Sequence, residues 1–409
     1  MSRSVGAAIT ALGVTQIIGW GTTHYMPAIL SGPIAAGLGL SPTTVLGGFS
    51  WGLLVAAASA RTSGRLMDRH GARRVMTAAS IIAALGLLVL ALARGWPALF
   101  LAWTLIGLAM RSILYDGAFA ALTVLAGGRA RRAISLLTLF GGFASTVFWP
   151  IGAWLDAWLG WRGALAVYAA LNLVPCALLH ALFAGGARDR PAGEPGDGEA
   201  QAGLGLPPAT AATALRLAAL GFTLHAFVAS AVSAHLVMLL GSFGFGAAVV
   251  VGAASLMGAA QVVARIAEMS LQSRYSETTI AVPSTALLPA AFAAALLLPA
   301  TPWAAALFVA LYGCANGLLT IVRGSLTLAV FGRRGYAELL GRIAAPALLV
   351  AAAAPVLFSA LVQALGPRAG LVLLAAFSLG ALAAIASLVR LAHRQAPAPA
   401  PGAGRGGPP

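Results

Sequence analysis

Long apolar stretches alternate with short polar connections along almost the whole chain. Twelve such stretches fall near 5–30, 43–63, 75–93, 97–125, 134–158, 162–184, 214–240, 246–270, 278–299, 302–330, 339–365 and 368–391. Each has about the length, ~20 residues, that a helix needs to cross the hydrocarbon core of a bilayer. The pattern predicts an all-α membrane protein with twelve transmembrane helices.

One connection differs from the others in length and composition. Residues 185–213 are rich in Gly and Pro and hold four of the ten acidic residues, which is typical of a flexible linker. This linker divides the spans into two sets of six, and a weak repeat links the sets: Leu12-Gly13-Val14-Thr15 resembles Leu220-Gly221-Phe222-Thr223. We therefore predict an N-terminal half (1–184), a cytoplasmic linker (185–213), a C-terminal half (214–394) and a disordered tail (395–409).

Composition and charge narrow the class of protein further. Hydrophobic residues make up 60% of the 409 residues and charged residues 9%, against ~25% in soluble domains. Of the 25 basic residues, all Arg, 19 fall in connections on the side of the N-terminus. This bias predicts that both termini are cytoplasmic, in a multi-pass protein of the cell inner membrane. The net charge of +15 then reflects topology and contact with lipid headgroups, not nucleic acid.

The connection between the second and third spans carries the sharpest motif. It reads Gly64-Arg65-Leu66-Met67-Asp68-Arg69-His70-Gly71-Ala72-Arg73-Arg74. Gly64 permits close helix approach, Asp68 can meet a helix N-terminus or an Arg, and Gly71 allows a tight turn. Arg69, Arg73 and Arg74 can anchor the loop at the cytoplasmic face.

This motif resembles the loop signature of the major facilitator superfamily, and it lies in the expected place after span two of twelve. The resemblance implies two six-helix halves and a conformational latch formed by Gly64, Asp68, Arg69, Gly71, Arg73 and Arg74. It also implies that spans one, four, seven and ten line the cavity. Thr15–Thr23, Met110–Leu122 and Leu139–Ser145 are similar to a branch of bacterial arsenite-efflux permeases.

Polar residues inside the four cavity-lining spans are the candidate site. The substrate-pathway candidates are His24, Arg111, Tyr115, His235, Asn316 and Arg323. Helical spacing places Arg111 and Tyr115 on one face and Ser112 and Asp116 on another. Because Arg stays charged, Asp116 is the candidate for proton coupling. A structural ion pair is the alternative for the charged set, and a hydrogen bond to a carbonyl is the alternative for both histidines. Gln261, Arg265 and Glu268 form one stripe near the cytoplasmic end of span eight, where interfacial structure is expected rather than substrate contact.

The resemblance to the arsenite-efflux branch implies a proton-driven exporter of arsenite or a related trivalent metalloid, which we expect to act as a monomer without a cofactor. The alternatives are uptake or exchange of a small organic anion, with Arg111 and Arg323 as carboxylate clamps, efflux of another small molecule, or a membrane sensor. The sequence shows no catalytic set or metal-ligand spacing, so we expect no enzyme and no metal site. Cys176 and Cys314 lie in apolar runs and are better read as small hydrophobic residues than as arsenic ligands.

Overall fold

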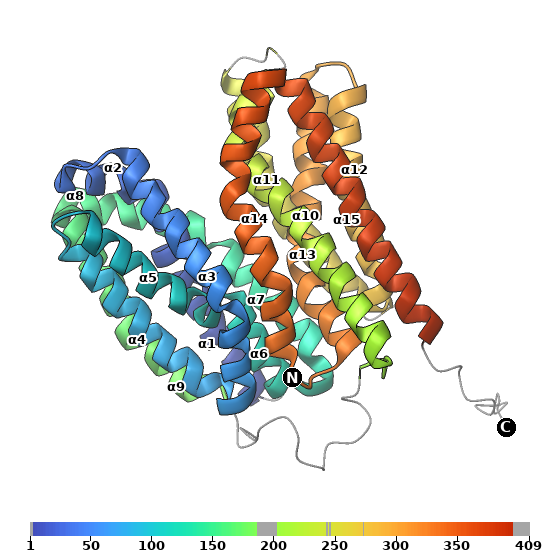
Figure 1. The fold of residues 1–409 in the computed structure, drawn as a ribbon, viewed down its shortest axis with the longest axis horizontal. Coiled ribbons are helices and arrows are strands. Elements are labelled where there is room, and N and C mark those ends of the chain that lie inside the picture. The colour runs from blue at the N-terminus through green and yellow to red at the C-terminus, as the bar shows by residue number, and fades with distance from the viewer. Residues whose placement is uncertain (1–2, 186–202, 243, 245–246, 273, 396–409) are drawn as a thin grey trace.

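The structure is a computed structural model that describes all residues except 1–2, 186–202, 243, 245–246, 273 and 396–409. The described part is helical (Figure 1). Before the linker the elements are α1 (Arg3–Gly19), η1 (Trp20–His24), α2 (Met26–Leu38), α3 (Pro42–His70), α4 (Ala72–Ala91), α5 (Trp96–Ile113), α6 (Tyr115–Ala126), η2 (Gly127–Arg129), α7 (Ala130–Gly142), α8 (Ala144–Leu171), η3 (Asn172–Cys176) and α9 (Ala177–Phe183). After it come α10 (Pro208–Gly241), α11 (Ala247–Leu271), α12 (Glu277–Leu297), α13 (Pro302–Phe331), α14 (Tyr336–Leu365) and α15 (Pro367–Gln395).

These elements trace the twelve passes expected within the described residues. The first pass is α1, η1 and α2 in succession, and the fourth is α5 and α6. Helix α8 contains the turn between passes five and six at Gly160, whose φ of 69° favours glycine. Most of the expected linker and all but one residue of the expected tail lie outside the described residues.

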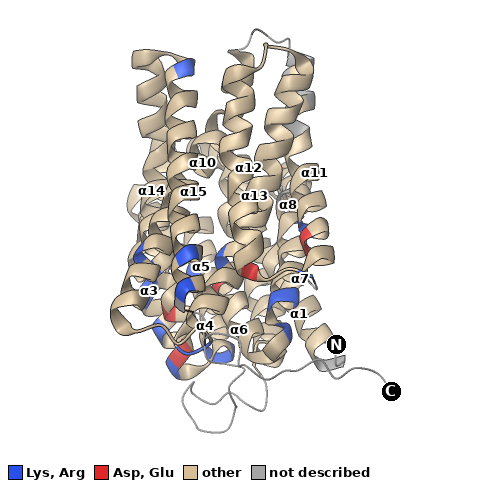
Figure 2. Cartoon of the chain, turned by 90° about the vertical axis from the view of Figure 1, so that its right-hand side faces the viewer, with Lys and Arg blue, Asp and Glu red and all other residues tan. Residues whose placement is uncertain are grey.

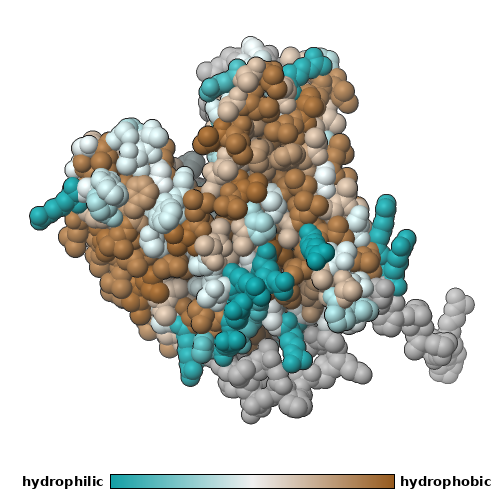
Figure 3. Space-filling model, in the orientation of Figure 1, coloured by the Kyte–Doolittle hydropathy of each residue, from teal (hydrophilic) through white to brown (hydrophobic). Residues whose placement is uncertain are grey.

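The helices pack as two bundles, α1–α9 and α10–α15 (Figure 1). The core of the first includes Leu99 and Trp103, and that of the second includes Phe292, Phe308 and Tyr312. The outer surface is also apolar: large side chains such as Val356, 72% exposed, face outward along the helices (Figure 3). Such a surface is stable against lipid but not against water.

The two bundles meet at one end of the molecule and separate at the other (Figures 1 and 3). We call the closed end the basic end; α1 begins and α15 ends there, and most of the arginines gather there (Figure 2). Helices α3 and α14 lie side by side at this end, as do α7 and α11. The space between the bundles therefore opens only toward the opposite end in this conformation.

Candidate functional site

The fourth pass is interrupted where its charged residues lie. Leu114 is extended (φ −89°, ψ −163°) and separates α5 from α6. Gly117 lies so close to the carbonyl oxygen of Ser112 that a Cβ at this position would overlap it. The side chain of Gln16 donates a hydrogen bond of 2.8 Å to the carbonyl oxygen of Ile113, which the break frees from helical bonding. The expectation of one continuous helix over 97–125 was therefore wrong.

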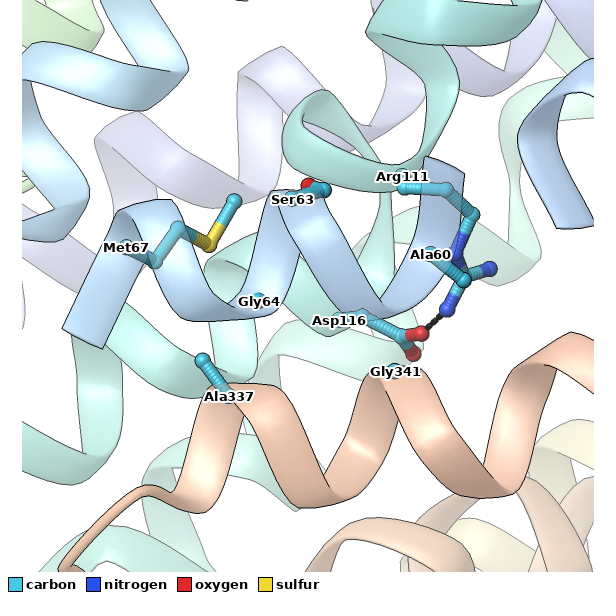
Figure 4. A pocket seen from close by; sticks show the side chains of 8 residues that line it. All are labelled: Ala60, Ser63, Gly64, Met67, Arg111, Asp116, Ala337 and Gly341. Atoms are coloured by element: carbon cyan, nitrogen blue, oxygen red, sulfur yellow. Dashed lines mark ion pairs between the residues drawn. The ribbon is translucent and has the colours of Figure 1, made fainter. Parts of the chain in front are cut away.

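This break changes the partners of Arg111. On an unbroken helix Arg111 would share a face with Tyr115, but in the structure it forms an ion pair with Asp116 across the break (Figure 4). Asp116 occupies the first turn of α6, where a carboxylate is also stabilised by the helix dipole. The spacing argument failed because it assumed regular helical geometry through Leu114.

Asp116 also joins the two bundles. Its Oδ1 lies 2.7 Å from Nη2 of Arg323, which belongs to α13. One carboxylate thus contacts a guanidinium from each half of the protein. The Arg111 and Asp116 residues are only 8% and 7% exposed, so each charge depends on its partner. The three charged residues predicted to form one set do lie together.

The charged set adjoins the contact between α3 and α14. A small pocket beside it is lined by Ser63, Gly64, Met67, Ala337 and Gly341, together with Arg111 and Asp116 (Figure 4). Gly64 lies against the backbone of Ala337, and Gly341 lies against the backbone of Ala60. Without Cβ atoms, both glycines allow the two helices to approach at backbone distance.

Asp68 closes the same contact at the basic end. Its carboxylate accepts hydrogen bonds from the backbone N–H groups of Ala337 (3.3 Å) and Glu338 (2.8 Å), in the first turn of α14. Oε1 of Glu338 in turn accepts a hydrogen bond of 2.8 Å from Nε of Arg61, and Nη2 of Arg65 lies 3.6 Å from the same oxygen. A carboxylate at a helix N-terminus gains from both hydrogen bonding and the helix dipole.

The other motif residues shape the loop rather than the contact. Gly71 has a φ of 81°, which explains the need for glycine at the turn. Arg73 donates a hydrogen bond of 2.8 Å to the carbonyl oxygen of Gly185, just after α9. The side chains of Arg69 and Arg74 are exposed at the basic end.

A second contact between the halves lies between α7 and α11. Glu268 Oε1 is 3.0 Å from Nη2 of Arg131, and its Oε2 accepts a 2.8 Å hydrogen bond from Ser135. One turn earlier on α11, Nη1 of Arg265 donates a hydrogen bond of 2.9 Å to the carbonyl oxygen of Thr138 in the opposite half. Arg265 and Glu268 thus both contact residues of the N-terminal half.

Aromatic and polar side chains surround Tyr115. The Trp20 ring lies 5.1 Å from the Tyr115 ring and 5.0 Å from the His24 ring. The Tyr115 hydroxyl donates to the Thr138 carbonyl oxygen (3.3 Å), the same atom that Arg265 contacts. His225 on α10 lies beside Asn316 and within electrostatic reach of Arg323.

Two of these residues, Arg265 and His225, were not among the site residues expected from sequence. Their polarity within spans eight and seven was the available signal, but only the fold places them beside Tyr115 and Asn316. The structure does not bring His235 into this group. Its Nδ1 lies 3.1 Å from the carbonyl oxygen of Ala231 on the same helix, and its ring packs on Phe358.

The cysteines are separate from these charges and from each other. Cys176 is 1% exposed in the apolar core of the first bundle. Cys314 donates from Sγ to the carbonyl oxygen of Ala260 at 3.5 Å. The described residues contain no group of three or more His, Cys, Asp or Glu side chains that could hold a metal ion.

Comparison with known proteins identifies the family. The sequence pattern of the Major Facilitator Superfamily matches residues 11–335, most of the chain. The chain belongs to the major facilitator superfamily. It is thus a multi-pass secondary transporter of a small solute, and not an enzyme.

Solved structures of this superfamily share the fold. The human organic anion transporter MFSD10 (TETRAN) has a TM-score of 0.70 and 18% identity, over 94% of this chain and 99% of that one. The proton:xylose symporter XylE, bound to 6-bromo-6-deoxy-D-glucose, has a TM-score of 0.72 and 12% identity, over 93% of this chain and 95% of that one. Both resemblances support the superfamily fold.

A sequence relative comes from Thermoproteus tenax. It is described as an uncharacterized 38 kDa protein in a 23S RNA operon and is 31% identical over 156 residues, 38% of this chain and 42% of that protein. The match thus spans less than half the length of this curated relative.

Proposed function

We propose that this superfamily member is a proton-coupled transporter of a small organic anion. Its halves, 1–184 and 214–394, would move against each other in the cell inner membrane with both termini cytoplasmic. In that orientation the basic end is the cytoplasmic gate, and the conformation described here faces outward. The observation that carries the proposal is the charge balance at the junction of the halves.

Positive charge exceeds negative charge around the candidate site. Among the described residues, Arg111, Arg265 and Arg323 supply three guanidinium groups, whereas Asp116 supplies one carboxylate, leaving a surplus of two. Glu268 pairs with Arg131, which also lies 3.7 Å from Glu277, so counting these three residues as well reduces the surplus to one but leaves it positive. Unbalanced charge is costly inside a membrane protein. An anionic substrate supplies the missing negative charge, and guanidinium is well suited to bind carboxylates.

Asp116 supplies the coupling. Arg111 and Arg323 stay protonated at any working pH, so Asp116 is the member of the set that titrates. Protonation would weaken the 2.7 Å ion pair to Arg323 and so release one half from the other. An anion bound to Arg323 would compete with Asp116 and favour its protonation. Substrate binding and proton binding would then open the gate together. His24, Tyr115 and Asn316 complete the proposed pathway, with His235 farther out.

The variant Asp116→Asn tests this coupling in proteoliposomes with radiolabelled monocarboxylates from acetate to benzoate. We expect loss of accumulation driven by a pH gradient and retention of exchange between equal internal and external substrate. Asp156→Asn, which removes a carboxylate on α8 outside the charged set, is the matched control and should behave as wild type. Uphill transport by Asp116→Asn with unchanged pH dependence would assign coupling elsewhere, with His24 or His235 as the next candidates.

Efflux of arsenite or a related trivalent metalloid is a second candidate, favoured by the resemblance of Met110–Leu122 to arsenite permeases. At neutral pH arsenite is an uncharged hydroxide, which hydroxyl, amide and guanidinium donors can bind without thiols. A sensitive bacterial strain expressing the Cys176→Ser/Cys314→Ser variant should therefore keep the resistance that wild type confers. Lost resistance at normal membrane abundance would indicate direct arsenic–sulfur coordination. No gain of tolerance with the wild-type protein would exclude the metalloid as substrate.

A further inference from the structure

Aromatic rings cluster around Tyr115, whose hydroxyl lies beside the contact of Arg265 with the opposite half, and we call this cluster the aromatic wall. Trp20 is central to them: its ring lies 5.1 Å from Tyr115, 6.0 Å from Tyr25 and 5.0 Å from His24. Tyr25 extends the wall to Trp149, at 6.4 Å between ring centroids. Trp20, His24 and Tyr25 all come from the first pass, where η1 interrupts the α-helix. The wall therefore belongs to the N-terminal half.

Guanidinium groups face this wall from the C-terminal half. The hydroxyls of both Tyr25 and Tyr115 lie within electrostatic reach of Arg265, and Tyr115 also lies within reach of Arg323. Tyr115 and Arg265 converge on one atom, the carbonyl oxygen of Thr138. The aromatic wall and the cationic wall thus meet at Tyr115, in the space closed toward the basic end.

Two polar atoms in this region have no partner among the described residues. They are Nε1 of Trp20 on the aromatic wall and Nε2 of His225 on the cationic wall, both inaccessible to water. Buried polar atoms in native proteins are nearly always hydrogen-bonded, so each wall carries a polar atom whose hydrogen bonding is unsatisfied in this closed conformation.

We propose that the site binds a planar aromatic ring that carries a single carboxylate, with the ring against Trp20 and Tyr25 and the carboxylate toward Arg265 and Arg323. This inference rests on the proposed function, anion transport, and specifies its substrate class. A ring gains from stacking and from burial against the aromatic wall. The carboxylate gains charge-assisted hydrogen bonds from guanidinium. An aliphatic anion gains only the second contribution, and a neutral aromatic alcohol gains only the first.

Calorimetry on the full-length protein in lipid nanodiscs tests this inference with three probes: benzoate, acetate and benzyl alcohol. We expect benzoate to bind about tenfold more tightly than acetate, a factor that corresponds to about 1.4 kcal/mol. Trp20→Leu should reduce benzoate affinity to that of acetate and leave acetate unchanged. Trp20→Phe retains a ring and should retain the preference. Arg265→Gln should weaken both anions and leave benzyl alcohol unaffected. Trp96→Leu, at the first residue of α5 and away from the basic end, is the control and should leave the affinities for all three probes unchanged.

The outcomes separate the substrate class from the proposed function. Equal affinity for acetate and benzoate in the wild type would overturn the aromatic preference and leave anion transport standing. Benzyl alcohol binding as tightly as benzoate would overturn anion recognition itself, and with it this inference. Absence of binding by both anions would have the same consequence. If Trp20→Leu does not fold, the wild-type comparison and Trp20→Phe still decide.

Discussion

The contact between Gly64 and α14 gives a prediction about the conformational equilibrium. A Cβ at Gly64 would overlap the carbonyl oxygen of Ala337 and lie 2.8 Å from Cα of Glu338. Both are backbone atoms of α14, so no side chain can rotate away to make room. Gly64→Ala must therefore move α3 and α14 apart wherever the basic end is closed. The change should selectively destabilise the conformation described here.

The size of this effect follows from the nature of the overlap. Overpacking of a well-packed contact costs about 1–3 kcal/mol. Since each 1.4 kcal/mol is a factor of ten, the population ratio should shift by roughly 5- to 150-fold toward the conformation that is open at the basic end. Gly47→Ala is a matched control on the same helix, because nothing lies within 4 Å of a Cβ there.

Electron–electron distance measurements can report this shift. Spin labels would replace Leu92 and Leu365, which are 76% and 66% exposed near the separated ends of the two halves, in a Cys176→Ser/Cys314→Ser background. We expect Gly64→Ala to move the distance distribution toward shorter separations and Gly47→Ala to leave it unchanged. Identical distributions for Gly64→Ala and wild type would refute the view that this glycine controls gate closure.

Two further predictions concern carboxylates that join the halves at the basic end. Asp68→Asn replaces the carboxylate that accepts hydrogen bonds from the first turn of α14 by a neutral amide. Because hydrogen bonds to charged groups contribute about 1.5–3 kcal/mol, we expect transport in vesicles to be largely lost while membrane abundance stays normal. Full activity would show that the motif serves only as a topology signal. Glu268→Gln removes the charge that pairs with Arg131, whose side chain is 11% exposed, and should speed proteolysis in the connections beside α7 and α11; unchanged cleavage would show that this contact does not hold the gate.

The passes could be predicted from sequence because hydrophobic length alone specifies them. A bilayer sets the number of apolar residues in a helix, so eleven connections are visible without knowledge of packing. The contacts of the motif were also predictable, since Gly64, Asp68 and Gly71 each have a local requirement: close approach, a helix end and a turn. The partner of Asp68 was not, because the N-terminus of α14 lies about 270 residues away in the chain.

The candidate site was only partly predictable for a different reason. Apolar periodicity continues smoothly through Leu114, so it does not report the break between α5 and α6. Asp116-Gly117 is compatible with a helix start, since acidic residues favour the first turn, but that signal is weak beside twelve strong spans. From its depth along span eight, Arg265 was expected to have a structural role near the cytoplasmic end rather than a role in the substrate pathway. Its contact with Thr138 brings it beside Tyr115, which the depth along the span does not reveal.

Several carboxylates join the halves, and three of them, Asp68, Asp116 and Glu268, differ in what they contact. Asp68 contacts the backbone N–H groups of a helix, and Glu268 contacts side chains from α7. Both can hold the gate without contacting the space between the aromatic and cationic walls. Asp116 alone among these three pairs with Arg323, which also lies within reach of Tyr115 and His225. Under the proposed coupling, a change in charge at that space would reach the basic end through Asp116. Loss of Asp68 or Glu268 should weaken closure with or without substrate, whereas loss of Asp116 should remove the dependence of closure on substrate and protons.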